Sequence, residues 1–317
     1  MTTSETVLAK PQSAAKIHLA LPHWLRNNPI LLKEMRARMR GWRSIVALTG
    51  FITLLSAIVS LIYFSFTSVG GLIGVNVLNE IGRAIFFTIY GIELLVVCMV
   101  SPALTAGAIS TEKEQQTYDL LRTTLLSARA LILGKLIAAV SFVLLFILAV
   151  IPLQSIAFMF GGLSMGEVIL SFLILVLTAL AFGSVGIFYS SFIPKTRVAT
   201  AAAQITSMVF VIVLPVLVLF AAISSDNWLN LNQMSDLTQT FLIATLWLAG
   251  ITSPAVTAAA TEIFLAQDQS LFFITEQLSG GTNLTIPSPW LGFIILYPLI
   301  TLILLTLTIR IVQRAEK

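Results

Sequence analysis

The stretch RARMRGWRSIVALTGFITLLSAIVSLIYFSF, residues 36–66, decides the class of this protein. It places four arginines directly before 23 residues that carry no charge. A helix needs about 20 apolar residues to cross the hydrocarbon core of a bilayer, so residues 44–66 are predicted to span a membrane. The arginines indicate which side faces the cytoplasm, because cytoplasmic segments hold the excess of Lys and Arg.

The composition of the whole chain agrees with a membrane protein. Its 317 residues are 57% hydrophobic and 10% charged, and the mean hydropathy is +0.98. Such a chain cannot cover its apolar surface with polar side chains, which excludes a water-soluble globular enzyme. The single cysteine, Cys98, cannot form an internal disulfide. Both histidines, His18 and His23, lie in the polar N-terminal tail, so we expect no metal site and no catalytic histidine within the bilayer.

Five further apolar stretches are long enough to cross a bilayer, which predicts an all-α integral membrane protein with six transmembrane helices. Residues 44–312 form the transmembrane domain, between a flexible tail (1–27) with an amphipathic segment (28–43) and a short C-terminal tail (313–317). The predicted spans are residues 44–66, 83–108, 131–160, 166–192, 200–223 and 289–312.

The positions of the basic residues predict the orientation. Every Lys and Arg except Arg83 lies in the N-terminal segment, the 109–135 connection, the 193–199 loop or the C-terminal end. The outer segment 224–288 contains five acidic residues and no basic one. Both termini are therefore predicted to be cytoplasmic.

One apolar stretch of the outer segment, residues 241–260, is not counted as a span. A single crossing there would require another before residue 289 to return the basic C-terminus to the cytoplasm, and residues 266–288 are too polar to cross. The stretch is predicted to be either a re-entrant hairpin broken near Ser253-Pro254 or a helix that lies on the outer face.

The segment NPILLKEMRARMRGWR, residues 28–43, is predicted to form an amphipathic interface helix. Asn28 fits the N-cap and Pro29 the first helical position. One face of this helix is apolar, and such a helix lies in the inner leaflet with its basic heads at the lipid phosphates. The basic edge beside that face consists of Lys33, Arg36, Arg40 and Arg43. It is either an anchor before the first span or, in addition, a contact for a protein partner.

The connection ISTEKEQQTYDLLRTTLLSARALILGK, residues 109–135, is too long for a simple turn. Thr111 and Glu114 have the spacing of a capping box, and Glu112 and Glu114 would lie in a first helical turn, where the helix dipole favours acids. Apolar side chains follow at helical spacing, at Tyr118, Leu121 and Leu125. The pattern predicts an amphipathic helix over about 110–126 that docks on a cytoplasmic partner. A solvated loop would not need this apolar face.

With these elements the chain resembles the membrane-spanning permease subunits of type-2 ABC transporters, which are mostly bacterial exporters. The resemblance covers the six-span plan and is most specific at Glu112-Lys113-Glu114, Thr117, Leu120-Leu121, Thr124-Leu125 and Gly134-Lys135. That family has an interface helix, a coupling helix after the second span and short re-entrant helices before the last span. Two departures are Gln116, where Gly is often found, and Leu125, where Pro is usual.

The resemblance implies a separate cytoplasmic ABC ATPase subunit. The Gly-Lys of this chain, Gly134-Lys135, is followed by Leu136 and does not form a phosphate-binding loop. We therefore expect no catalysis, cofactor or metal here, with ATP and Mg²⁺ held by the partner. The residues expected to couple to the ATPase are Glu112, Glu114, Thr117, Tyr118 and Leu121.

The resemblance also implies a second permease subunit, as a homodimer or heterodimer, within the lipids of a bacterial cytoplasmic (inner) membrane, and no nucleic acid partner. Export as the direction follows from the resemblance and from the lack of a large outer domain. Two alternative functions stay open at this point. One is an ATP-independent channel or secondary carrier, and the other is a non-transporting membrane scaffold.

Glu93 is the clear ionisable residue inside a predicted span. Such groups are costly in lipid and usually face the interior of a helix bundle or a cavity. Glu93 is interpreted either as a pathway residue that contacts a substrate amine or as a protonated acid hydrogen-bonded between helices. One carboxylate does not form a proton relay, which disfavours an ion-coupled carrier.

Overall fold

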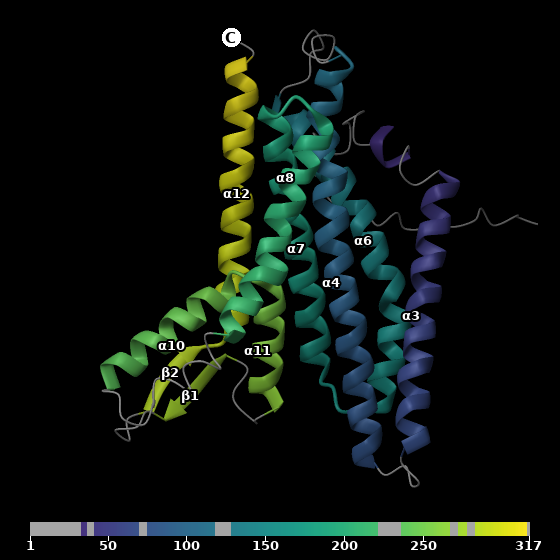
Figure 1. Ribbon diagram of the computed structural model, residues 1–317, viewed down its shortest axis with the longest axis vertical. Coiled ribbons are helices and arrows are strands. Elements are labelled where there is room, and N and C mark those ends of the chain that lie inside the picture. The colour runs from purple at the N-terminus through teal and green to yellow at the C-terminus, as the bar shows by residue number, and fades with distance from the viewer. Residues whose placement is uncertain are drawn as a thin grey trace, which may run out of the picture.

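The computed structural model describes residues 33–36, 41–69, 75–117, 128–220, 236–266, 272–277 and 283–315, and most of these residues are helical (Figure 1). Six helices in this part of the chain are long and apolar enough to cross a membrane. The predicted all-α membrane fold is therefore confirmed. In lipid a helix satisfies every backbone hydrogen bond within its own segment, which explains why length and hydropathy identify these elements.

The helices that form the six candidate spans extend a few residues beyond most of the predicted limits. The fifth span continues from α8 through a π-helical segment, η1, to Phe220. The bounds are α3 Trp42–Val69, α4 Val75–Glu114, α6 Ala128–Phe160, α7 Met165–Phe192, α8 Thr196–Met208, η1 Val209–Val213 and α12 Pro289–Ala315.

Helix α4 lies at the centre of the bundle and packs against α3, α6, α7 and α8 (Figure 1). Its closest partner is α7, where Gly186 faces the backbone of α4. A Cβ atom on Gly186 would lie 2.6 Å from the carbonyl oxygen of Pro102 and 2.0 Å from Thr105 Oγ1. Ser101 Oγ donates a hydrogen bond to the carbonyl of Ala179 at 2.6 Å. Small residues thus let the two backbones approach closely, as they do in other membrane bundles.

The turn between α6 and α7 explains the isolated position of Arg83. Gly161 and Gly162 have φ of 91° and 78°, which L side chains rarely adopt. Arg83 Nε donates to the carbonyl of Gly162 at 2.7 Å, just beyond the C-terminal end of α6. A cation at a helix C-terminus is favourable. This local interaction accounts for a basic residue at the end of the molecule opposite to the other basic residues that the structure describes.

The outer segment contains a broken helix pair and a β-hairpin, at the end of the molecule opposite to the C-terminus (Figure 1). The helix axis bends by 118° between α10 (Asp236–Ile251) and α11 (Pro254–Ala266). The break lies where the hairpin alternative placed it, and the bend excludes a single unbroken helix over 241–260. The antiparallel strands β1 (Phe273–Gln277) and β2 (Asn283–Pro287) were not predicted.

Two hydrogen bonds hold this outer segment in place. Trp247 Nε1 of α10 donates to the carbonyl of Pro287 at 2.8 Å, and the Tyr297 hydroxyl of α12 donates to the carbonyl of Thr252 at 2.9 Å. The second bond reaches the break between α10 and α11, where the backbone carbonyls lose their helical partners. The bent pair is therefore fixed against both β2 and α12.

The predicted interface helix lies mostly outside the described residues. Residues 33–36 are helical, and Lys33 and Arg36 are exposed. Arg40 falls outside the described residues, and Arg43 lies in the first turn of α3 rather than in the preceding helix. The amphipathic character of residues 28–43 as a whole stays a prediction.

Candidate functional site

The last turn of α4 holds two of the residues expected to couple to a partner, Glu112 and Glu114, but not in the predicted way. Thr111, Glu112 and Glu114 end the long helix α4 instead of beginning a new one. The expected capping box at Thr111 and Glu114 is therefore wrong. The spacing T-x-x-E also occurs within a continuous helix, where the side chains need not cap anything. Tyr118 and Leu121, with the rest of the predicted coupling helix, lie outside the described residues.

A Schellman motif ends α4. The Thr117 amide donates to the carbonyl of Glu112 at 3.0 Å, and the Gln116 amide donates to the carbonyl of Lys113 at 3.3 Å. Gln116 has φ of 56°, the left-handed conformation that this motif requires. Glycine adopts it without a steric penalty, whereas a side chain raises its free energy. The position at which Gln116 departs from the common family Gly is thus the position where Gly would fit best.

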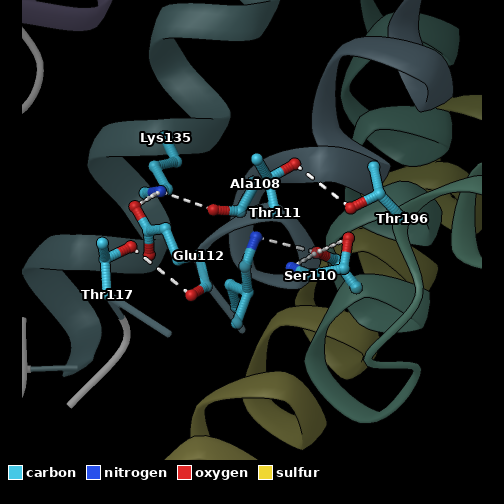
Figure 2. Close-up of polar contacts among 9 residues, drawn as sticks. Ala108, Ser110, Thr111, Glu112, Thr117, Lys135 and Thr196 are labelled. Atoms are coloured by element: carbon cyan, nitrogen blue, oxygen red, sulfur yellow. Dashed lines mark hydrogen bonds and ion pairs between the residues drawn. The ribbon is translucent and has the colours of Figure 1, made fainter. Parts of the chain in front are cut away.

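An ion pair joins the last turn of α4 to α6. Lys135 is 4% exposed, and its Nζ donates both to Glu112 Oε1 and to the carbonyl of Ala108 (Figure 2). The second oxygen, Glu112 Oε2, is buried and has no partner among the described residues. Because Lys135 is shielded from water, loss of its partner would leave a buried charge, which is far more costly than loss of a surface ion pair.

A second lysine joins the last turn of α4 to α7. Lys113 Nζ donates to the carbonyl of Ser191, in the last turn of α7. A cation near the C-terminus of a helix satisfies a free carbonyl and interacts favourably with the helix dipole. One turn earlier on α4, the amides of Ile109 and Ser110 donate to Ser190 Oγ of α7 at 2.8 and 2.9 Å. Helices α4 and α7 are therefore bonded through two successive residues of α7.

The third connection reaches α8. Thr196, the first residue of α8, donates its hydroxyl proton to Glu114 Oε2 at 2.6 Å. Because that proton is used, Thr111 must donate in the 3.3 Å hydrogen bond between the two threonine hydroxyls (Figure 2). Glu114 therefore lies beside a helix N-terminus after all, that of α8, where a carboxylate is favourable.

These contacts form one unit, which we call the α4 clamp. It consists of Glu112, Lys113 and Glu114 of α4, Lys135 of α6, Ser190 and Ser191 of α7 and Thr196 of α8. Sequence reasoning identified both glutamates as functional and missed their partners. Lys135 carried a signal, because it is a cation at the start of a predicted span, whereas Ser190, Ser191 and Thr196 carried none.

Glu93 lies far from the clamp, 19 residues earlier on α4, which corresponds to about 28 Å of helix. It is 1% exposed, and Gln154 Nε2 of α6 donates to its Oε2 at 3.0 Å. Its other oxygen, Oε1, has no hydrogen-bond partner among the described residues. The structure thus brings Glu93 together with Gln154, which sequence reasoning missed. An amide within a predicted span was the signal that could have found it.

No site for a metal is visible in the described ranges, where no three His, Cys, Asp or Glu side chains gather. A comparison with known families finds that the model of the ABC-2 family transporter protein matches residues 28–315. The match runs from the predicted interface helix to the end of α12 and so includes all six candidate spans. No curated protein shows a significant match to the chain.

Proposed function

Because the chain belongs to the ABC-2 family of transporter proteins, we propose that it is the permease subunit of an ABC exporter, driven by a separate ATPase that docks beyond the C-terminal end of α4. Members of this family are multi-pass membrane permeases, and a partner subunit hydrolyses the ATP. The ATP and Mg²⁺ of the transport cycle then belong to that partner, and this chain supplies the pathway and the mechanical connection to it.

The α4 clamp is the observation that carries this proposal. The segment predicted to couple to the ATPase, residues 110–126, begins within the clamp and continues beyond Thr117. It bonds the end of α4 to α6, α7 and α8. A displacement of the docking segment would therefore be passed to four spans together, instead of being absorbed by one flexible helix end.

The distribution of charge supports a cytoplasmic position for the clamp. Lys113, Lys135, Lys195 and Arg197 lie at this end of the bundle, to which α12 also brings the C-terminus (Figure 1). The described part of the acidic outer segment, in α10, α11, β1 and β2, lies at the opposite end (Figure 1). By the positive-inside rule both termini are cytoplasmic, and we place the protein in a bacterial inner membrane.

A second permease subunit completes the pathway in this proposal. Helix α4 occupies the centre of the described bundle and is packed on several sides by other spans. A pathway is therefore expected between two copies, or between this chain and a related one, and not through the middle of a single chain. Lipids cover the remaining apolar faces, and no feature of the chain calls for a nucleic acid.

The proposal is tested by purifying the chain in lipid nanodiscs with candidate ABC ATPases from the same genome. We expect one ATPase to form a stable complex and its ATP hydrolysis rate to change when the permease is present. The variant Lys135→Met should keep the ATPase bound but lose this change in rate, because the clamp is broken. Arg129→Met, at an exposed position on the same helix, is the matched control.

The outcomes separate the alternatives. An ATPase that binds without any change in hydrolysis would favour a scaffold, and substrate flux without any ATPase would favour a channel or carrier. Normal coupling in Lys135→Met would contradict the role that we give to the clamp.

A further inference from the structure

A groove runs between the outer halves of α6 and α7. It has a volume of about 430 Å³, and each of the two helices contributes four lining residues. Most are apolar, among them Phe158 of α6 and Ile169 and Phe172 of α7. The volume lies within the range of about 300–1,000 Å³ that is typical of small-molecule sites.

The polar part of this groove leads to Glu93. The lining hydroxyl of Ser155 is used within its own helix, where it donates to the carbonyl of Ile151 at 2.9 Å. The lining amide of Gln154 instead points across to α4 and donates to Glu93 Oε2 at 3.0 Å. Gln154 therefore forms the wall between the groove and a carboxyl group that is 1% exposed.

The carboxyl group behind that wall is incompletely satisfied. Glu93 Oε1 has no hydrogen-bond donor, and Glu93 forms no ion pair with any described residue. The cation toward the outer end of α4 is Arg83, ten residues before Glu93, and it donates instead to the carbonyl of Gly162. A buried acid without a cationic partner is costly, and a cation that donates hydrogen bonds is the group that relieves this cost most.

From the groove and the carboxyl group together, we propose that this site binds an amphipathic primary amine. The apolar chain lies against Phe158, Ile169 and Phe172, and the ammonium group reaches Glu93 when the side chain of Gln154 turns aside. This inference rests on the proposed transport function, because it identifies such amines as the class of substrate. An anionic amphiphile would be repelled by the same carboxylate, and a neutral one would leave it unpaired.

The test measures binding to the isolated chain in nanodiscs of neutral lipid, without an ATPase. The probe is dodecylamine, and dodecanol, with the same apolar chain and no charge, is the matched ligand. Binding is followed as the rise in unfolding temperature, read from tryptophan fluorescence. We expect dodecylamine to raise this temperature at concentrations roughly tenfold lower than dodecanol, as a charged hydrogen bond implies.

Two variants locate the effect. Glu93→Gln keeps the shape of the side chain and should remove the preference for the amine over the alcohol. Ile169→Trp fills the groove and should abolish the response to both probes. Ile156→Trp, at an exposed position on α6 outside the groove lining, should respond like the unmodified chain.

Equal responses to the two probes in the unmodified chain would overturn the proposal, since the bilayer alone would then explain them. An undiminished response in Ile169→Trp would also overturn it, because binding would lie elsewhere. The assay contains no ATPase, so a negative result here leaves the coupling experiment unaffected. Conversely, failure of the coupling experiment would not change the binding measured in nanodiscs.

Discussion

Helix α4 carries two acidic sites whose surroundings differ sharply. At its C-terminal end, Glu112 is paired with Lys135, and the same turn bonds to α7 and α8. In its middle, Glu93 receives a single hydrogen bond, from the uncharged amide of Gln154, and forms no ion pair with a described residue. Each glutamate keeps one oxygen without a hydrogen-bond partner, so the cation beside Glu112 is what distinguishes the two sites. The first site bonds helices to one another, whereas the second can still accept hydrogen bonds from a cationic ligand. The difference teaches that a buried acid is best judged by the partners around it rather than by its depth.

The largest expected effect comes from breaking the ion pair at the clamp. Lys135→Met leaves Glu112, whose side chain is 19% exposed, without its cation and should lower the free energy of unfolding by about 3 kcal/mol, the lower end of the usual cost of removing one partner of a buried pair. Chemical unfolding of the chain in mild detergent measures this loss. The double variant Lys135→Met, Glu112→Gln should recover part of it, and Arg129→Met should show no loss. A stability equal to that of the unmodified chain would show that the pair is not structural.

The close packing between α4 and α7, along the part of α4 between Glu93 and Glu112, gives the next largest effect on stability. Gly186→Ala places a methyl group 2.6 Å from the carbonyl oxygen of Pro102, which is backbone and cannot turn away. We expect a loss of about 1–3 kcal/mol from this overpacking. Gly50→Ala is the matched control, because a Cβ there meets nothing within 4 Å. If both substitutions have the same effect on the unfolding midpoint, the helices are less closely packed than the structure indicates.

A smaller effect of opposite sign is expected at the end of α4. Gln116→Gly removes the penalty of a left-handed side chain and should stabilise the chain by about 1 kcal/mol. The unfolding midpoint measures this change, and Gln115→Gly, one residue earlier, provides the comparison. A loss of stability in Gln116→Gly would mean that the Gln116 side chain contributes an interaction of its own.

The smallest effect should come from Glu93→Gln. Gln keeps an oxygen that can accept from Gln154, so the unfolding midpoint should change by less than about 1 kcal/mol. Glu112→Gln, which removes the charge that pairs with Lys135, should cost clearly more. Equal costs for the two substitutions would break the distinction between a site that ties helices and a site that binds a ligand.

The spans could be predicted from sequence because lipid imposes strict rules on length and hydropathy. The β-hairpin could not, since its two five-residue strands lie in a polar stretch that resembles a loop. The end of α4 was misplaced because Thr111 and Glu114 fit a helix start by spacing alone. The real signal was a helix end at Gln116, which was hidden because that position lacks the usual Gly.

For each contact of the candidate site, only one of the two interacting residues could be predicted from the sequence. Glu112 and Glu114 were expected to be functional, but their partners Lys135 and Thr196 lie 23 and 82 residues further along the chain. Such pairings depend on how the helices pack, and a single sequence holds no record of it. The role of Glu93 was left between pathway and packing for the same reason, because Gln154 lies 61 residues away.

The central claim is that the α4 clamp moves as one body when the ATPase binds nucleotide. Spin labels at Gln115 and Arg197 report the distance across the clamp, and labels at Gln115 and Ile45 report the distance from it to α3; all three positions are exposed. Helix α3 packs against the outer half of α4 through Phe51, Leu55 and Val59. None of the hydrogen bonds of the clamp described above involves α3.

Distances between the labels should therefore be measured by pulsed electron spin resonance in the complex with the ATPase, with and without trapped ATP. The account predicts that the distance distribution between Gln115 and Arg197 is narrow and does not change with ATP, whereas the distribution between Gln115 and Ile45 shifts. A distance between Gln115 and Arg197 that broadens or shifts with ATP, while that to Ile45 stays fixed, would contradict it.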